Sequence, residues 1–166
     1  MSDGEAAPAD AGLAAIRPLL ERQPVAALAT LHRGAPAVSM VPFALVGAAQ
    51  GLAIHVSRLA THTADMLAEA QVALLVTALP GDAPTPLALP RLALQGRARA
   101  CEAGSAEHAQ ARAAYLAKLP DAEPLFDFPD FMLFLIEPES ARWVAGFGRA
   151  TSLVGARLHA ALEGTA

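Results

Sequence analysis

Residues 25–43 read VAALATLHRGAPAVSMVPF, and this stretch decides the fold class. Two apolar runs, 25–31 and 36–43, flank the turn-prone sequence His32-Arg33-Gly34. A glycine so close between two strand-like runs is typical of a β-hairpin. We therefore predict that the two runs pair as antiparallel strands.

Further strand-like runs follow the hairpin, and helical segments separate them one at a time. We predict strands over residues 52–57, 72–79, 91–101, 131–137 and 142–147, and helices over residues 11–22, 61–69 and 105–118. The run VALLVTAL over residues 72–79 is nearly all apolar, which predicts burial on both faces or in a barrel wall. Residues 80–90 and 121–129 are predicted loops, Pro138 is predicted to end a strand, and the residues after Arg149 are predicted to form a short tail.

Short turns between the early strands favour antiparallel pairing, because a parallel crossover needs a dozen or more residues. A closed or nearly closed barrel buries many apolar strands in one domain. We predict a mainly β fold with flanking helices (α+β) as a single domain over residues 11–166. Residues 1–10 are predicted to be a disordered lead-in.

The composition excludes several classes of function. The 166 residues carry a net charge of −4 and 5% aromatic residues, which argues against a nucleic-acid partner. The acidic N-terminus lacks a signal-peptide pattern, and no apolar run reaches the ~18–20 residues of a membrane span. We expect a cytoplasmic protein without a membrane partner. The single cysteine, Cys101, excludes an internal disulfide, and we interpret it as a small, partly buried apolar residue.

Residues 54–67, IHVSRLATHTADML, carry the clearest chemical signal. A strand ends at Ser57, and a helix begins with Thr61-His62-Thr63 after a short connection. The first N–H groups of a helix lack internal partners and lie at the positive end of its dipole. Together with Arg58, these hydroxyl and imidazole groups suit a phosphate. Ordinary N-capping by Thr61 is the alternative.

Three further motifs follow the same order as in one known family. GAPAVSMVPF (34–43), the strand-to-helix turn at Ser57, RLALQGR (91–97) and RWVAGFGR (142–149) together resemble the FMN-binding split β-barrels related to pyridoxamine 5′-phosphate oxidase. The resemblance covers about residues 12–153 and is closest to the haem-utilisation branch, which has a His-Thr pair and a GFGR-like ending.

The resemblance implies a six-stranded antiparallel Greek-key split barrel, and a homodimer that holds one FMN per subunit at its interface. It implies that Val38, Ser39 and Met40 line the flavin through their backbone, that Ser57, Arg58, Thr61, His62 and Thr63 hold its phosphate, and that Arg91 and Gln95 lie near the ring or ribityl chain. The vitamin B6 oxidase has Ser-Arg-Lys where this chain has Thr61-His62-Thr63. The difference argues against oxidation of pyridoxamine phosphate.

Three functions follow from the resemblance. The first is a flavin-dependent oxidoreductase with a small-molecule substrate or electron acceptor, in which the flavin carries the redox chemistry. The second is a haem-handling protein, for which His159 is the candidate axial ligand. The third is a non-catalytic flavin carrier. No metal site and no protein catalytic residue is predicted.

The sequence leaves open the roles of several other side chains. His55 alternates with Ile54 and Val56, so it lines either the barrel or the flavin edge. His159 is the haem-ligand candidate or a solvated tail residue. Trp143 and Phe147 are core residues or contacts to a partner's flavin, and Arg149 is either solvated or a similar contact.

Overall fold

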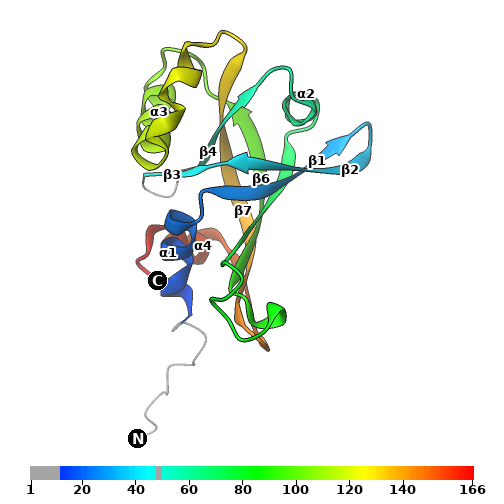
Figure 1. The fold of residues 1–166 in the computed structure, drawn as a ribbon, viewed down its shortest axis with the longest axis vertical. Coiled ribbons are helices and arrows are strands. Elements are labelled where there is room, and N and C mark those ends of the chain that lie inside the picture. The colour runs from blue at the N-terminus through cyan, green and yellow to red at the C-terminus, as the bar shows by residue number, and fades with distance from the viewer. Residues whose placement is uncertain (1–11, 48–49) are drawn as a thin grey trace, which may run out of the picture.

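The strands of the computed structural model join into one antiparallel sheet (Figure 1). The structure describes residues 12–47 and 50–166, so the predicted lead-in over residues 1–10 lies outside the described residues. The strands are β1 (Val25–His32), β2 (Ala35–Pro42), β3 (Ala44–Val46), β4 (Gly51–Ser57), β5 (Gln71–Thr77), β6 (Arg91–Ala100), β7 (Phe131–Gly146) and β8 (Arg149–Val154). Their order is β2-β1-β5-β6-β7-β4-β3, and β8 pairs with β7.

The predicted mainly β fold with flanking helices is confirmed, but the six-strand count is not. The sheet has eight strands, and its path of paired strands stays open between β2 and β3. The added strands are β3, a short extension of the chain beyond β2, and β8, which folds back on β7.

The hairpin predicted from residues 25–43 is confirmed. Strands β1 and β2 pair along their whole length, from Val25 opposite Pro42 to His32 opposite Ala35. Arg33 and Gly34 between them have φ values of 52° and 80°. Two successive left-handed residues match the right-handed twist of the flanking strands, and so this tight turn closes without splaying them.

Strand β7 contradicts the prediction that Pro138 ends a strand. It runs unbroken over Phe131–Gly146 and pairs with β4, β6 and β8. Gly96 of β6 lies opposite Pro138 while Gln95 lies opposite Ser140, which leaves Glu139 as an extra residue in β7. Such a bulge accommodates a proline, which cannot donate a ladder hydrogen bond.

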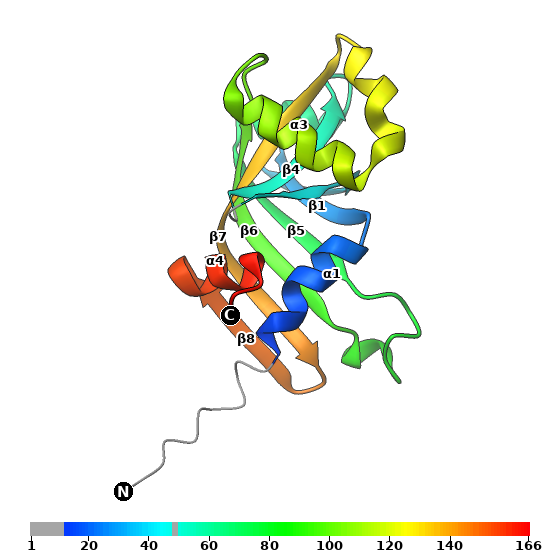
Figure 2. The same ribbon diagram turned by 90° about the vertical axis from the view of Figure 1, so that its left-hand side faces the viewer.

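The helices cover the two ends of the sheet (Figure 2). Helix α2 packs against β1, β2 and β6; α3 packs against β3, β4 and β7; and α4 packs against β7, β8 and α1. Their bounds are η1 (Leu13–Ala15), α1 (Ile16–Arg22), α2 (Thr61–Ala68), η2 (Pro86–Ala88), α3 (Ala106–Lys118), η3 (Pro120–Asp127) and α4 (Gly155–Glu163).

The predicted tail and the second predicted loop are therefore wrong. The residues after Arg149 form β8 and α4, and η3 occupies most of residues 121–129. The tail has an apolar spacing, Leu158, Ala161 and Leu162, that packs one face of α4 into the core. No helix in the described ranges is both long and apolar enough to cross a bilayer.

Two separate hydrophobic cores lie on opposite faces of the sheet. The larger contains α1, the buried face of α4 and the inner side chains of most strands, among them Trp143. The smaller lies beneath α3 and η3 and includes Cys101, Tyr115 and Leu133. The two clusters share no residue.

Strand β5 is buried on one face, which excludes the first alternative predicted for residues 72–79, burial on both faces, and leaves the second, a barrel wall. Val72, Leu74 and Val76 point into the main core, whereas Leu75 is 42% exposed and Thr77 is also exposed. Two-sided burial would need a layer over the outer face, and no described element covers it. The apolar outer side chains therefore remain on the surface.

Lys118 at the end of α3 joins the α3 layer to α1. Its Nζ donates hydrogen bonds to the carbonyl oxygens of Leu20 (2.8 Å) and Gln23 (2.7 Å), and lies 3.7 Å from the centroid of the Phe43 ring. Burial lowers the pKa of Lys118 to about 8. The ammonium group thus caps carbonyls at the end of α1.

Substitution of Gly96 by alanine tests the β6–β7 bulge. A Cβ at this position would collide with the carbonyl oxygen of Glu137 and lie 3.0 Å from its carbonyl carbon, and neither backbone atom can move aside. We expect Gly96→Ala to lower the free energy of unfolding by about 3 kcal/mol. Urea denaturation followed by circular dichroism measures this loss.

Gly47→Ala is the matched control for this experiment. Gly47 has open space around its Cα, and a Cβ there would meet no atom within 4 Å. We expect its unfolding midpoint to stay close to that of the parent protein. Equal midpoints for the two variants would contradict the close approach at Gly96.

Candidate functional site

The outer face of the sheet carries an unusual amount of exposed apolar surface. Val38 and Met40 of β2 are 72% and 64% exposed. Val38 lies in register with Ala29 and Ala73, and Met40 with Ala27 and Leu75. We call these six residues the apolar face: Ala27, Ala29, Val38, Met40, Ala73 and Leu75. A large exposed apolar patch marks a binding or association surface.

The predicted β6 residues lie on the same side of the sheet as the apolar face. Gln95 continues the row of Val38 through Ala73, and Ser140 Oγ donates a hydrogen bond to its Oε1 (3.2 Å). Arg91 lies in register with Thr77, one row beyond Leu75. Ser39 is different, because it lies opposite Leu28, a fully buried residue, and so belongs to the inner face.

The turn between β4 and α2 is held by Asp130, a residue that sequence analysis missed. Ser57 Oγ donates a hydrogen bond to Asp130 Oδ2 (2.7 Å) and accepts one from the Leu59 amide (3.1 Å). The Arg58 amide donates to the Asp130 carbonyl oxygen (2.6 Å). The Ser57 hydroxyl therefore orders the turn and has little capacity left for a ligand.

Thr63 has a similar internal role. It is fully buried, and its hydroxyl donates to the Ser57 carbonyl oxygen at 2.6 Å. Two of the three hydroxyls that were predicted to contact phosphate, those of Ser57 and Thr63, therefore form hydrogen bonds within the protein. Thr61 and Arg58 remain exposed.

Helix α2 begins without the side-chain cap that was the alternative interpretation of Thr61. Thr61 is the first helical residue, and Ala60 at the N-cap position has no side chain that can accept a hydrogen bond. The Ala60 carbonyl accepts from the amides of Thr63 and Ala64. The start of α2 is therefore an uncapped helix end flanked by a hydroxyl and a guanidinium group.

A buried carboxylate ties α2 to β1. Asp65 Oδ2 accepts a hydrogen bond from Thr30 Oγ1 (2.9 Å), and its Oδ1 accepts one from His32 Nδ1 (2.7 Å). Burial acts to raise the pKa of Asp65, but the hydrogen bonds from His32 and Thr30 and the nearby imidazoles outweigh it and lower the pKa. Because Nδ1 of His32 donates to Asp65, its Nε2 is free to bind a ligand.

His62 is half-buried and interacts electrostatically with Asp65. Its Nε2 is buried and has no hydrogen-bond partner in the described part of the chain. Burial lowers the pKa of His62, and the charge of Asp65 partly opposes that shift. The neutral imidazole is thus favoured in the folded protein.

His55 lies in the smaller core, away from the apolar face. It is 6% exposed and stacks on Phe126 with ring centroids 3.8 Å apart and planes 4° apart. Tyr115 and Phe131 complete an aromatic box around it. Burial, reinforced by the positive charges of His108 and Arg112, lowers the pKa of His55 to about 4. The prediction that it lines a barrel or flavin edge is wrong.

His159 lies on α4 rather than in a tail. Its Nδ1 is 2.9 Å from the Gly155 carbonyl oxygen, which can only accept, so Nδ1 donates and Nε2 is free. His159 borders a cleft of about 380 Å³ that Gln50, Arg99, Glu107, Leu135, Glu137 and Pro138 also line.

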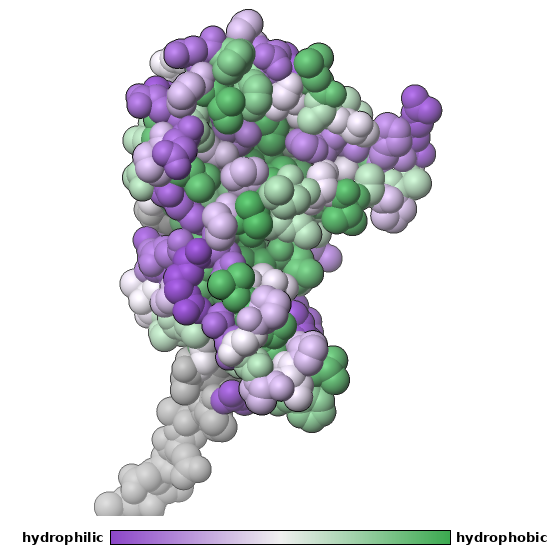
Figure 3. All heavy atoms as spheres, in the orientation of Figure 1, coloured by the Kyte–Doolittle hydropathy of each residue, from purple (hydrophilic) through white to green (hydrophobic). Residues whose placement is uncertain are grey.

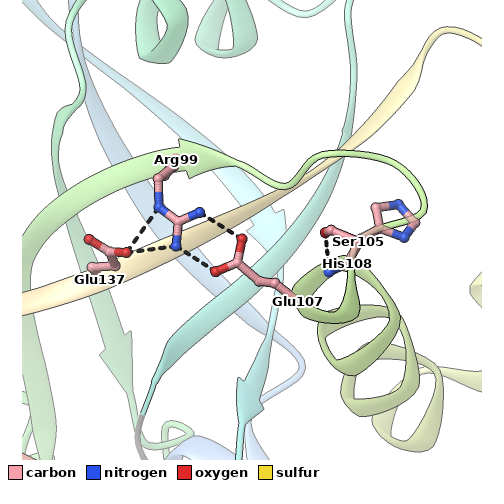
Figure 4. A network of polar contacts seen from close by, with 5 residues as sticks. All are labelled: Arg99, Ser105, Glu107, His108 and Glu137. Atoms are coloured by element: carbon pink, nitrogen blue, oxygen red, sulfur yellow. Dashed lines mark hydrogen bonds and ion pairs between the residues drawn. The ribbon is translucent and has the colours of Figure 1, made fainter.

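Arg99, one of the residues that line this cleft, forms a network of polar contacts with two carboxylates (Figure 4). It donates to both carboxylate oxygens of Glu107, one at 2.6 Å, and to Glu137 at 2.8 and 3.0 Å. Ser105 caps α3 by accepting from the His108 amide (3.1 Å), as predicted, and so fixes the helix turn that carries Glu107. Arg99 therefore uses four of its five N–H donors on two carboxylates.

Burial distinguishes the remaining candidate residues, which are Trp143, Phe147 and Cys101. Trp143 is buried in the main core and cannot reach a partner, whereas Phe147 is 75% exposed. Cys101 is buried, and the pKa of its thiol is raised, first by burial, which supports the apolar interpretation. No group of three or more His, Cys, Asp or Glu within residues 12–47 and 50–166 is arranged to hold a metal ion.

Comparison with known proteins identifies the family. Residues 13–145 match the family model described as pyridoxamine 5′-phosphate oxidase. The chain belongs to the pyridoxamine 5′-phosphate oxidase family. The chain is also 39% identical over 124 residues to a chloroplastic protein of Arabidopsis thaliana described as a non-canonical haem oxygenase. That alignment covers 75% of this chain and 36% of the plant protein, so the chain spans about a third of the length of that relative.

Two solved structures are also similar to the chain. The heme-binding protein from Mycobacterium smegmatis has 28% identity and a TM-score of 0.79, over 92% of this chain and 60% of that chain. The haem storage protein HutZ from Vibrio cholerae has 26% identity and a TM-score of 0.68, over 75% of this chain and 88% of that chain. These proteins agree with the predicted resemblance to the haem-utilisation branch.

Sequence analysis missed the side chains that order this region. Thr30 follows Ala26 and Leu28 on the inner face of β1, and a polar residue in that alternation indicates a buried hydrogen bond. Asp65 lies among the buried positions of α2, between Thr63 and Met66. The hydrogen bond between Thr30 and Asp65 depends on how α2 packs on β1, and no local sequence pattern contains that information.

The stability of the fold should depend on pH through His55. The folded-state pKa is about 4 against 6.5 for the unfolded chain, so the neutral ring stabilises the fold fully above pH 6.5. As the pH falls from 6.5 to about 4, this contribution is lost and the free energy of unfolding decreases by up to about 3 kcal/mol. We expect His55→Phe to keep the stacking and to lose this part of the acid sensitivity.

The difference between parent and variant isolates the effect of His55. Urea unfolding at pH 7.5, 5.5 and 4.5 gives both stabilities, and acidic groups elsewhere contribute equally to each protein. A parent and variant that lose stability in parallel over this range would show that His55 is not the titrating group.

Proposed function

We propose that this protein binds haem through the split-barrel scaffold of its family. The observation that carries the proposal is its 39% identity to a haem oxygenase over three quarters of the chain. Two solved structures at 26% and 28% identity are a haem storage protein and a heme-binding protein. Bound haem would supply an iron centre for oxygen or electron chemistry.

The imidazole of His159 fits the role of an iron ligand. Its Nδ1–H donates a hydrogen bond to the Gly155 carbonyl oxygen, and a bond of this kind orients a ligating histidine and leaves Nε2 for the metal. The ring is exposed at the edge of a cleft. The ring of His32 is held in a comparable way, by a hydrogen bond from its Nδ1 to Asp65. His32 therefore serves as the control histidine for His159, on a different part of the molecule.

FMN is the second candidate cofactor, and the uncapped start of α2 favours it. Arg58, Thr61 and the first amides of α2 offer donors for a phosphate, as in the predicted clamp. Val38 and Met40 provide an exposed apolar surface against which an isoalloxazine ring would pack. Ser57 and Thr63 weaken this candidate, because their hydroxyls are used within the protein.

A second copy of the chain is the proposed occupant of the apolar face. Figure 3 shows hydrophobic side chains over the middle of the sheet, whereas the projecting tip of the β1–β2 hairpin is hydrophilic. The six residues of the apolar face carry no charge, and all six belong to paired strands that present them in two rows of three. Burial of such a surface in a symmetric pair would remove it from water.

Absorption spectroscopy of the purified protein distinguishes the two cofactors. We expect added haemin to give a Soret band that saturates at one haem per chain. We expect His159→Ala to shift and weaken this band, while His32→Ala leaves it unchanged. A band that His32→Ala abolishes instead would move the ligand to β1.

A flavin result would overturn the haem proposal in favour of the second candidate. Its signature is a yellow protein with two visible absorption bands that releases FMN on denaturation and gives no Soret band with haemin. A protein that remains colourless with both compounds would contradict both candidates.

Charge on the apolar face should separate the two copies. We expect Met40→Lys to convert a dimer into a monomer, because a lysine there would be buried without a partner. Size-exclusion chromatography with light scattering measures the mass. Leu67→Lys is the control, since Leu67 is similarly exposed but lies on α2. A parent protein that is monomeric, or a Met40→Lys dimer, would contradict the proposed interface.

A further inference from the structure

The segment η3 lies at the surface of the smaller core and covers His55. In Figure 2 it is the yellow coil beside α3, the helix on which it packs. None of its residues is fully buried, and only Ala122 and Phe126 are half-buried. The Phe126 ring stacks on the imidazole of His55, with ring centroids 3.8 Å apart and planes 4° apart. One aromatic side chain of a thin surface segment therefore covers a buried histidine.

The other contacts of η3 are weak or local. The Glu123 carboxylate lies 3.9 Å from Arg112 of α3, and their side chains are 72% and 42% exposed, so this ion pair contributes little. Arg112 also lies 4.9 Å from the centroid of the Phe126 ring. The backbone hydrogen bonds at the two ends of η3 join residues three or four positions apart, and none in the described part of the chain joins η3 to a strand. The segment can therefore lift while the sheet stays intact.

The surroundings of His55 suit a neutral ring only. The residue is 6% exposed, and its buried Nδ1 has no hydrogen-bond partner within residues 12–47 and 50–166. Tyr115 and Phe131 place two more aromatic rings beside it. Protonation puts an N–H on both ring nitrogens, so the Nδ1–H would be a buried donor without an acceptor. The closed position of η3 therefore excludes the imidazolium form.

Charges on the neighbouring helix also oppose protonation of His55. Burial lowers the pKa of His55 to about 4, and the charges of His108 and Arg112 on α3 add to this effect. No carboxylate in the described ranges forms an ion pair with His55. The other titratable groups on α3 and η3 near this site are Tyr115, Asp121, Glu123 and Asp127. A ring that is exposed to water has the ordinary pKa of 6.5, so acid favours the state that exposes it.

We propose that η3 is a lid over His55 and that it opens in acid, when the imidazole takes up a proton. In the closed state the neutral ring stacks on Phe126. In the open state the imidazolium is hydrated, and the rings of Tyr115 and Phe131 become accessible beside it. The proposal does not depend on which cofactor the protein binds.

Proton linkage sets the direction and the size of the response. Above pH 6.5 the ring is neutral in both states, so the ratio of open to closed lid does not depend on pH. Between pH 6.5 and about 4 only the open state takes up the proton, because the closed-state pKa is about 4. The ratio of open to closed lid then rises about tenfold for each pH unit, to a limit of about 300-fold.

Hydrogen–deuterium exchange measured by mass spectrometry tests the lid. The parent protein and His55→Phe are labelled at pH 7.5 and pH 4.5, and the rates are compared for residues 119–130. This segment has the same sequence in both proteins, so its intrinsic exchange rates cancel. We expect equal rates at pH 7.5 and a rate about tenfold or more higher in the parent at pH 4.5. The reason is that the phenyl ring of the variant keeps the stack and cannot be protonated.

Two further variants assign the response to His55. His108→Gln is the matched control, because it removes a neighbouring imidazole on α3 and leaves His55 in place. We expect it to keep most of the acid response. His55→Leu is a second neutral variant with a smaller side chain than phenylalanine, and we expect it to lose the response as His55→Phe does. Circular dichroism of each variant verifies that it is folded.

Three results would overturn the proposal. The first is an equal acid response in the parent and in the two His55 variants, which would exclude His55 as the group that titrates. The second is loss of the response in His108→Gln while the His55 variants keep it. The third is an equal acceleration of exchange over residues 106–117 of α3, which would show that the whole layer opens rather than η3.

Discussion

The close approach of β6 to β7 at Gly96 is the constraint on which the rest of the sheet depends. Only a residue without a side chain can lie against the Glu137 carbonyl, and this contact allows β7 to continue past Pro138. Because β7 stays continuous, it pairs with β6, β4 and β8 in turn. The cleft beside His159 and both hydrophobic cores include residues of this one strand.

Local patterns predicted most of the strands and the early helices. The hairpin followed from a glycine between two apolar runs, and the capped helix after Ser105 followed from its hydroxyl. Pro138 misled the prediction because a proline ends an ideal strand but is tolerated in a bulge. That bulge needs a glycine on a neighbouring strand, 42 positions earlier, so no local window contains the signal.

The candidate site was predicted less completely than the fold. The sequence placed Arg58 and Thr61 correctly at a helix start, but it could not show that the hydroxyls of Ser57 and Thr63 bond within the protein. It also missed Asp65 and Asp130, whose partners are distant in the chain. Hydrogen-bond capacity is a property of packing, and residue type alone does not reveal whether a donor is free.

The separation of the two hydrophobic cores has a consequence for motion. The α3 and η3 layer buries its side chains against one face of the sheet and shares none with the main core. Lys118 is a polar tie between this layer and α1. The layer can therefore open as a cooperative unit of its own, and amide hydrogens in α3 would exchange with solvent through sub-global openings, at lower free energy than those of β6 and β7.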